Sequence, residues 1–366
     1  MDLCEIQYGF AFDSARFTED PTYPPLVRIR DVKRGYSETF FSGEYPEQYV
    51  IHAGDLLIGM DGEFNIARWK SRDALLNQRV CKISAKKGTE EEYLRFALSR
   101  SLKEIENRTA FVTVKHLSAK EFNKLELTVP SLDEQNRKAN TLRKIEQIID
   151  LRNKELNNIE DLIKARFVEM FGECRESISA GDLMHNMRNG VSPSTSGKHQ
   201  EKVLTLSAIT QGQFDPNMWK DGIFDAIPAA DKRIWSTDFY MCRGNGNKSL
   251  VGAGVYSADD RDDLVFPDTV IAASVDTTRV CLPYLFVAWM QPGIREQIEA
   301  GARTTNGTYK INQQIISKIK VPLPPLPEQQ QFATFVAQID KSKAVIQKSL
   351  DEMQLLFDSL MQQYFG

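Results

Sequence analysis

Hydrophobic side chains recur every three or four residues along two stretches of the chain, each about forty residues long. The first stretch covers residues 132–172 and the second covers residues 326–366. This spacing predicts in each stretch a helix with one apolar stripe. The stripe positions are Leu142, Ile145, Ile149, Leu156, Ile159, Ile163 and Phe167 in the first stretch, and Phe332, Phe335, Val336, Ile339, Ile346, Leu350, Met353, Phe357, Leu360 and Tyr364 in the second.

The two stretches are copies of one another. Aligned without a gap, at an offset of 194 positions (326 minus 132), they agree at 10 of 41 positions, where roughly two or three matches are expected by chance. Each copy begins after a proline-containing break and closes with Phe-Gly, and proline resists extension of a helix backwards. A helix of this length is about 60 Å long. Because a single apolar stripe needs a partner, we expect the two helices to pair with each other.

The segments before each long helix show a fainter repeat of strand and helix patterns. In the first segment, residues 24–32 predict a strand, 55–69 a strand–turn–strand unit, 78–83 a strand and 91–108 an amphipathic helix. The corresponding stretches of the second segment are 201–209, 238–256, 269–275 and a helix that begins near Leu282. After them, 302–312 aligns with 107–117, and this alignment sets Arg108 over Arg303 and Lys115 over Lys310.

The chain therefore reads as a duplication of a globular unit followed by a long helix. We predict an α/β (α+β) architecture, with two globular domains joined by two long antiparallel helices that form a coiled coil with an internal pseudo-two-fold axis. The globular units have diverged more than the helices, which suggests two different tasks for the units and one shared task for the helices. The predicted segments are 1–128, 129–172, 173–320 and 321–366.

Composition is that of an ordinary globular protein with a net charge of −4, 46 basic and 50 acidic residues. No apolar run approaches the roughly 18 residues of a membrane span, and the start does not resemble a signal peptide. The five cysteines are scattered, which favours a reducing compartment, and we expect a cytoplasmic protein. Proteins that bind nucleic acid are often basic overall, so DNA binding here would need charge sorted by face or supplied by partner subunits.

Two polar loops of the second segment carry candidate binding chemistry. Residues 243–249 read Arg-Gly-Asn-Gly-Asn-Lys-Ser. They differ from a phosphate-binding P-loop because Asn247 stands where glycine belongs and an apolar strand follows. The loop fits either a plain hairpin turn or a turn that contacts bases, since arginine pairs with guanine and asparagine with adenine. Residues 303–310 fit either a solvated loop between two helices or a loop that contacts phosphates and bases.

Other motifs carry no chemistry. Residues 20–25 have the wrong order for the D-P-P-Y box of amino-methyltransferases, and Pro267-Asp268 lacks the rest of a nuclease motif. The four histidines lie far apart and are interpreted as surface residues, and no nucleophile motif is present. We therefore predict a recognition or assembly protein without catalytic residues, metal or cofactor.

Three stretches together resemble the DNA-specificity subunit of type I restriction–modification systems. They read GFAFDSARF (9–17), VPSLDEQNRKANTLRKIEQIID (129–150) and VPLPPLPEQQQFATFVAQIDK (321–341). Along the chain they occur in the order of that family. One departure is the start, because family members usually carry a short extra stretch there, of which the second unit keeps the equivalent at residues 176–181. A trimmed or misassigned start is an interpretation that the sequence leaves open.

The resemblance implies a function and a set of partners. Each globular unit would be a target-recognition domain that reads one half of a bipartite, asymmetric double-stranded DNA site, and the paired helices would act as a ruler. The helices would also dock two DNA-methyltransferase subunits, and a nuclease–translocase subunit would join the full complex. S-adenosylmethionine and ATP would be bound by those partners. The near-neutral charge fits if the methyltransferase subunits share the phosphate contacts.

Within that picture, loop position and side-chain chemistry nominate residues for DNA contacts. They are Ser14, Arg16, Asp61, Asn65, Arg68, Arg108 and Lys115 in the first unit, and Arg243, Asn245, Asn247, Lys248, Arg303, Asn306, Tyr309 and Lys310 in the second. Two other readings of the chain stay open. It could be the specificity chain of a related system whose methylase and nuclease share one polypeptide, or a coiled-coil scaffold without DNA contact.

Overall fold

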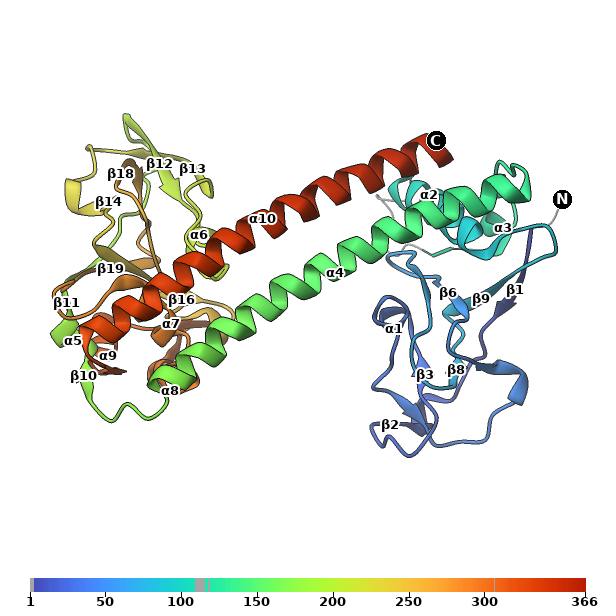
Figure 1. The fold of residues 1–366 in the computed structure, drawn as a ribbon, viewed down its shortest axis with the longest axis horizontal. Helices are drawn as coiled ribbons and strands as arrows, with labels where there is room; N and C mark the ends of the chain where they lie inside the picture. Colours follow the sequence, from blue (N-terminus) through green and yellow to red (C-terminus); the bar gives the residue numbers. More distant parts are fainter. Residues whose placement is uncertain (1–2, 109–115, 118, 306) are drawn as a thin grey trace. The chain divides into compact units, whose positions relative to one another are not determined.

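The computed structural model describes residues 3–108, 116–117, 119–305 and 307–366. The chain divides into two compact units. Unit 1 comprises Met1–Lys154 and Gln347–Gly366, and unit 2 comprises Glu155–Ile346. The division falls within the two long helices, so that each unit holds one half of each helix (Figure 1).

The two predicted long helices are confirmed as α4 (Leu132–Phe171) and α10 (Leu326–Phe365). The two helices contact each other within each unit. In unit 1 the Lys138 ammonium lies 5.4 Å from the centre of the Tyr364 ring. In unit 2 the Lys343 ammonium pairs with Glu160 at 3.0 Å. In unit 2 the Phe167 and Phe332 rings also pack, with centres 5.6 Å apart. From Glu160 to Phe167 the numbers rise along α4, while those of the partners fall along α10, so the helices run antiparallel within unit 2.

The repeated glutamine near the start of each long helix is buried. Gln329 is fully buried and Gln135 is 1% exposed. The Gln329 side chain accepts a hydrogen bond from the backbone N–H of Cys281 (3.0 Å) and donates to the carbonyls of Arg279 (3.1 Å) and Pro324 (2.8 Å). Gln135 makes the same three bonds in unit 1, from the Glu90 N–H and to the Gly88 and Pro130 carbonyls. Each glutamine therefore ties the first turn of its long helix to a loop that lies earlier in the chain, just before the helix that begins at Glu91 in unit 1 or at Leu282 in unit 2.

The repeated Phe-Gly at the end of each copy has a packing role. Phe171, at the end of α4, packs on Tyr284 in unit 2, with ring centres 5.0 Å apart. Phe365, at the end of α10, packs on Tyr93 in unit 1, with ring centres 5.2 Å apart. Each tyrosine is the third residue of its helix, which begins at Glu91 or at Leu282. Each donates a hydroxyl hydrogen bond to a backbone carbonyl just before a long helix, that of Thr128 or Pro322.

Unit 1 is built on two small sheets. The first has the antiparallel order β1-β9-β6-β7 and the second the order β3-β8-β5, in which β3 and β8 are parallel. The strands are β1 (Cys4–Tyr8), β9 (Val80–Ala85), β6 (Leu56–Gly59), β7 (Ile66–Arg68), β3 (Leu26–Val27), β8 (Ala74–Leu76) and β5 (Val50–Ile51), with a separate pair β2 (Phe17–Thr18) and β4 (Phe40–Phe41). The helices and 3-10 turns are α1 (Ile29–Arg34), α2 (Glu91–Arg108), α3 (Ala119–Phe122), η1 (Ser14–Arg16) and η2 (Glu47–Tyr49).

Unit 2 repeats both sheets strand for strand. The order β11-β19-β15-β17 matches the first sheet, and β12-β18-β14 matches the second, with β12 and β18 parallel and β13 added at one edge. The strands are β11 (Met184–Asn189), β19 (Val270–Val275), β15 (Asp238–Cys242), β17 (Gly254–Tyr256), β13 (Trp219–Phe224), β12 (His199–Leu204), β18 (Arg261–Val265) and β14 (Arg233–Ile234), with the pair β10 (Ser177–Ser179) and β22 (Lys320–Pro322). The helices and the 3-10 turn beside β14 are α5 (Ala180–Leu183), α6 (Ser207–Thr210), α7 (Leu282–Trp289), α8 (Pro292–Gly301), α9 (Gln313–Lys318) and η3 (Ala230–Lys232).

Most local predictions are confirmed. The strand–turn–strand units at 55–69 and 238–256 are the antiparallel pairs β6–β7 and β15–β17, and the helix at 91–108 is α2. The strand predicted at 24–32 is wrong beyond Val27, because α1 follows it. There the Asp31 carboxylate accepts a hydrogen bond from the Arg28 N–H at 3.0 Å, and Gly35 ends the helix in the left-handed region, with φ 77°. The matching stretch 201–209 likewise turns from strand β12 into helix α6.

Candidate nucleic-acid interface

The two polar loops nominated in unit 2 meet in one small sheet. Its order is β16-β21-β20, formed by β16 (Gly244–Asn245), β21 (Thr308–Lys310) and β20 (Arg303–Thr305). Asn245 lies opposite Tyr309, and Lys310 lies between Gly244 and Arg303. The stretch 303–310 lies between helices α8 and α9, as one of the two interpretations placed it, but it carries strands β20 and β21 instead of an irregular loop. The structure brings together residues that are about sixty positions apart in the sequence.

Arg243 anchors this sheet to the larger one through its backbone. Its N–H donates to the Thr269 carbonyl (2.8 Å) and its carbonyl accepts from the Ile311 N–H (2.9 Å). The Arg243 guanidinium donates to the Asp268 carbonyl at 3.2 Å. The chain thus leaves strand β15 at Arg243, and the next two residues, Gly244 and Asn245, pair with β21. The Arg243 side chain is half-buried and partly committed to this junction.

The asparagines of the loop shape its turn. The Asn245 side-chain oxygen accepts from the Asn247 N–H at 2.8 Å. The Asn247 side-chain oxygen accepts from the N–H (3.1 Å) and the hydroxyl (2.9 Å) of Ser249, and it caps the turn η4 (Lys248–Leu250). A bidentate contact with adenine uses both the oxygen and the nitrogen of an amide. Since both oxygens already serve the turn, these residues fit the role of holding the loop in shape.

Three exposed cations remain on this sheet and its turn, Lys248, Arg303 and Lys310. None of the three forms an ion pair within the described part of the chain. Tyr309, between them on β21, is half-buried. Unpaired lysine and arginine side chains around a half-buried aromatic ring suit contact with a phosphate backbone and base edges.

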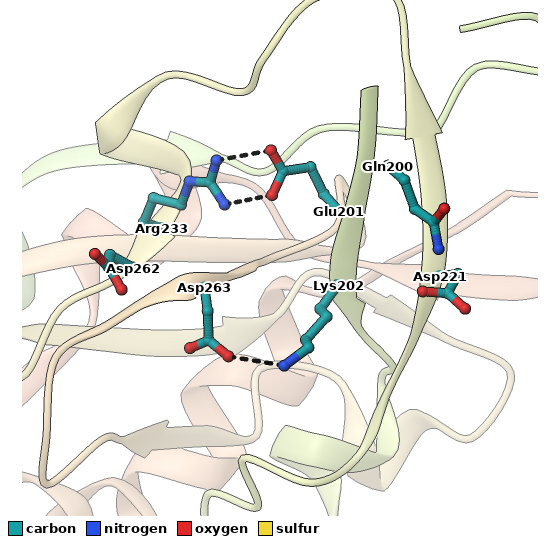
Figure 2. A pocket seen from close by; sticks show the side chains of 7 residues that line it. All are labelled: Gln200, Glu201, Lys202, Asp221, Arg233, Asp262 and Asp263. Carbon is teal, nitrogen blue, oxygen red and sulfur yellow. Dashed lines mark hydrogen bonds and ion pairs between the residues drawn. The ribbon is translucent and has the colours of Figure 1, made fainter. Parts of the chain in front are cut away.

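A second surface of unit 2 has the opposite charge. An open pocket of about 570 Å³ over β12, β13 and β18 is lined by Gln200, Glu201, Lys202, Asp221, Arg233, Asp262 and Asp263 (Figure 2). Both of its cations are neutralised, because Arg233 pairs with Glu201 through two bonds (2.7 and 3.0 Å) and Lys202 pairs with Asp263 (3.2 Å). The remaining carboxylates make this face electronegative and unsuited to DNA. The described residues contain no group of three or more side chains that could hold a metal ion, and no described helix is long and apolar enough to cross a membrane.

Unit 1 has a junction that corresponds to that of Arg243. There the Met60 N–H donates to the Arg79 carbonyl (2.9 Å), and the Met60 carbonyl accepts from the Leu117 N–H (2.7 Å). Leu117 thus corresponds to Ile311, and His116, which bridges to Asp61, corresponds to Lys310. The sequence alignment that set Lys115 over Lys310 is off by one residue. The corrected offset of 194 (310 minus 116) equals that of the long helices. Lys115 and Asn306 lie outside the described residues.

The nominated residue Asp61 is directed at its own chain. The residue is 8% exposed, and its carboxylate accepts hydrogen bonds from His116 Nδ1 (2.5 Å) and from the Arg79 guanidinium. Burial raises the pKa of Asp61, but the bonds from His116 and Arg79 outweigh that effect and lower the pKa below its ordinary value. Asp61 is therefore a charged group that holds two other side chains in place.

Arg68 is also engaged internally. From β7 its guanidinium reaches Glu92 (2.5 Å), Glu91 (2.8 Å) and the Gly54 carbonyl (2.7 Å). Glu92 bonds in turn to Arg95 (2.8 Å), which reaches α4 through Glu146. This ion network ties β7, α2 and α4 together, so little of Arg68 remains for an external ligand.

The other nominated residues of unit 1 occupy turns and element ends. Ser14 and Arg16 are exposed in η1, which the Asp13 side chain caps through the Ala15 N–H at 3.0 Å. Asn65 closes the turn between β6 and β7, where its carbonyl accepts from the Gly59 N–H. Arg108 is the last residue of α2. Arg16 therefore has the most accessible cation among the nominated residues whose side chains are described in unit 1.

Replacing Glu92 with glutamine should make unit 1 less stable at neutral pH by about 2 kcal/mol, the usual size of a hydrogen bond between charged groups. Burial raises the pKa of Glu92, but Arg95 and Arg68 outweigh this and lower the pKa. A carboxyl whose folded pKa is lowered stabilises the fold above its unfolded value of about 4.3, and this contribution is lost as the pH falls through the folded pKa. Urea unfolding at several pH values should therefore show wild type and variant converging in acid. Glu19→Gln, at an exposed site, is the control, and a pH-independent difference would contradict the explanation.

Sequence reasoning missed two residues of unit 1 and one structural signal. Arg79 was not nominated, and His116 was interpreted as a surface residue, which its 54% exposed side chain confirms, but not as part of a cluster. Their shared partner, Asp61, lies 18 and 55 positions away, so no local pattern reveals the cluster. The hairpin β20–β21 had a local signal, because Asn-Gly between short strands favours a two-residue hairpin turn.

Comparisons with known proteins agree with this fold. A family model described as "Type I restriction modification DNA specificity domain" matches residues 1–161 and 296–354, more than half of the chain. The chain is 39% identical over 163 residues to the type I restriction enzyme EcoBI specificity subunit of Escherichia coli, and 26% identical over 184 residues to the EcoKI specificity subunit of Escherichia coli strain K12. These matches cover 44% and 49% of this chain, but only 34% and 39% of the relatives' own lengths.

Solved structures extend the likeness to the whole chain. A crystal structure of a type I restriction–modification system S subunit from M. genitalium matches with a TM-score of 0.59 and 14% identity, over 100% of this chain and 94% of that one. A chain from work on complex assembly and conformational transition of the type I R-M system matches with a TM-score of 0.51 and 17% identity, over 99% and 97%. At these identities the likeness concerns the fold. Together with the family model, it means that this chain belongs to the family of type I restriction modification DNA specificity proteins.

Proposed function

We propose that this chain is the non-catalytic DNA-recognition subunit of a type I restriction–modification complex, and that it reads a bipartite, asymmetric target through its two globular domains. The observation that carries the proposal is that both units share one scaffold but differ in their candidate DNA-contacting residues, here called the reader of each unit. Both units have the same two sheets in the same strand order. At the equivalent junction, unit 2 pairs Gly244 with Lys310, whereas unit 1 pairs Asp61 with His116. Two units that share one scaffold but carry different residues at this junction suit two different half-sites.

The long helices are proposed as the spacer between the readers. Their contacts within each unit, which are antiparallel in unit 2, support a two-helix coiled coil with a pseudo-two-fold axis. We accordingly retain the predicted arrangement of 1–128 and 173–320 as recognition domains and of 129–172 and 321–366 as spacer helices. A 40-residue helix spans about 60 Å, which exceeds one turn of DNA, about 34 Å.

Exposed apolar residues on the helices support docking of two like partners. Unit 1 exposes Leu151 (57%) on α4 and Leu356 (43%) on α10. Unit 2 exposes Val345 (70%) on α10 and Leu162 (48%) on α4. Val345 follows Leu151 by 194 positions and Leu356 follows Leu162 by the same number, so the two sets are related by the internal repeat. Exposed apolar patches often mark protein interfaces.

The partners proposed for these surfaces are two DNA-methyltransferase subunits, joined in the full complex by a nuclease–translocase subunit, in the cytoplasm. Base flipping and methyl transfer would take place in the methyltransferase subunits, with S-adenosylmethionine bound there, and ATP would be bound by the translocase. Sharing of the phosphate contacts with these subunits accounts for DNA binding by a chain with a net charge of −4.

Genome-wide mapping of methylated bases tests the proposal in a host that carries or lacks the gene. A bipartite methylated motif should appear only with the chain present. The double variant Arg303→Ala, Lys310→Ala should reduce methylation about tenfold or more and relax one half of the motif, because it removes two exposed cations from the reader of unit 2. Lys220→Ala, which removes an exposed cation from β13 beside the acidic pocket, is the matched control. A motif that does not depend on the chain would favour a scaffold without DNA contact.

A further inference from the structure

Asp61, Arg79 and His116 occupy the position in unit 1 at which the candidate reader of unit 2 is built. In both units a strand ends, its next residue bonds through the backbone to two neighbouring segments, and the following residue begins a new pairing. Met60 makes these bonds with Arg79 and Leu117, and Arg243 makes them with Thr269 and Ile311. By this register Asp61 takes the place of Gly244, Arg79 that of Thr269, and His116 that of Lys310.

The three side chains are arranged in a way that an incidental surface contact does not require. The Asp61 carboxylate is buried, and its two oxygens serve different partners, Oδ1 for His116 and Oδ2 for Arg79. The side chains of Arg79 and His116 are 55% and 54% exposed. One buried acceptor thus fixes two exposed side chains, each of which retains polar nitrogen atoms beyond the contact.

This geometry limits what the cluster can recognise. Asp61 holds Arg79 by one terminal nitrogen, which leaves donors on the rest of the planar guanidinium. An arginine held in this way suits the two acceptors on the major-groove edge of guanine, O6 and N7. Asp61 also fixes Nδ1 of His116 at 2.5 Å, so that Nε2 is the ring atom left for an outside partner.

We propose that Arg79 and His116 read bases of the half-site recognised by unit 1, with Arg79 directed to a guanine, and that Asp61 is a positioning residue that acts through them. The proposal rests on the proposed function and adds to it the residues that determine one half-site. It also replaces the sequence-based nomination of Asp61 as a direct contact. In unit 1 the proposed contacts are thus held by a buried carboxylate, whereas Gly244 stands at the equivalent position of unit 2.

The test uses the full complex, co-expressed with its methyltransferase subunits, and measures methylation for every single-base change in both half-sites. Arg79→Ala should lose discrimination at one guanine of one half-site, with a decrease of roughly 10- to 100-fold in the preference for that base. His116→Ala should relax a position in the same half-site. Asp61→Asn, which keeps the shape but removes the charge, should relax the positions read by Arg79 and His116, and the other half-site should be unchanged for all three variants.

Lys87→Ala is the matched control, because it removes an exposed cation just beyond the opposite end of strand β9 from Arg79. It should leave both half-sites unchanged. A profile in which Arg79→Ala and His116→Ala keep full discrimination at every position, with only the melting temperature lowered, would overturn the inference and leave a structural ion cluster. A wild-type complex that methylates no bipartite site would instead overturn the proposed function, so the two failures are distinguishable.

Discussion

Replacing Gln329 with leucine should lower the free energy of unfolding of unit 2 by about 3 kcal/mol. The side chain is fully buried and makes three hydrogen bonds, one from the Cys281 N–H and two to carbonyls. Leucine has a similar volume but no polar atom, so one buried and two part-buried hydrogen bonds would be lost. Each unsatisfied buried group costs about 1–3 kcal/mol. The effect should appear as a lower urea midpoint for unit 2.

Gln330→Leu is the matched control, because the neighbouring glutamine is exposed on the same helical turn. It should change the stability by less than about 0.5 kcal/mol. Gln135→Leu should produce the equivalent loss in unit 1, since Gln135 makes the equivalent bonds. Equal effects of the variants at positions 329 and 330 would show that the buried bonds do not stabilise the attachment of the helix.

The glutamines show how far the sequence predicts the fold. The repeat marked Gln135 and Gln329 as matching positions, and the helical pattern placed both in a first turn. The reason for their identity lies in loops that precede α2 and α7, about 45 to 50 positions earlier for each glutamine. Periodicity reports which elements form and which face is apolar. It does not report which distant backbone groups a buried amide must satisfy.

The candidate site was harder to predict for the same reason. Asp61 begins the turn after strand β6 and Arg68 ends strand β7, but their partners His116 and Glu92 are 55 and 24 positions away. In unit 2 the nominations at 243–248 and 303–310 converge, because two separate polar segments pair as β16 and β21. Residue chemistry indicated which segments were candidates, and the strand pairing decides which side chains are left exposed.

Inserting four residues after Lys154 in α4, and four before Gln347 in α10, should lengthen the gap between the two half-sites by about one to two base pairs. These positions mark the division between the units on both helices, so the matched insertions keep the helix contacts within each unit in register. One helical turn adds about 6 Å, and the rise of DNA is about 3.4 Å per base pair. The sequence of each half-site should be unchanged, because neither reader is altered.

An insertion in α4 alone should behave differently, since it shifts only one helix of the antiparallel pair. It would move α4 out of register with α10 and break contacts such as Lys343–Glu160 or Lys138–Tyr364. We therefore expect reduced methylation instead of a new spacing. Mapping methylated motifs for the matched and the single insertion distinguishes these outcomes. An unchanged gap with the matched insertion, or a change in a half-site sequence, would contradict the role of the helices as a ruler. A longer gap with both half-sites preserved would show that distance along the helices is converted into distance along DNA.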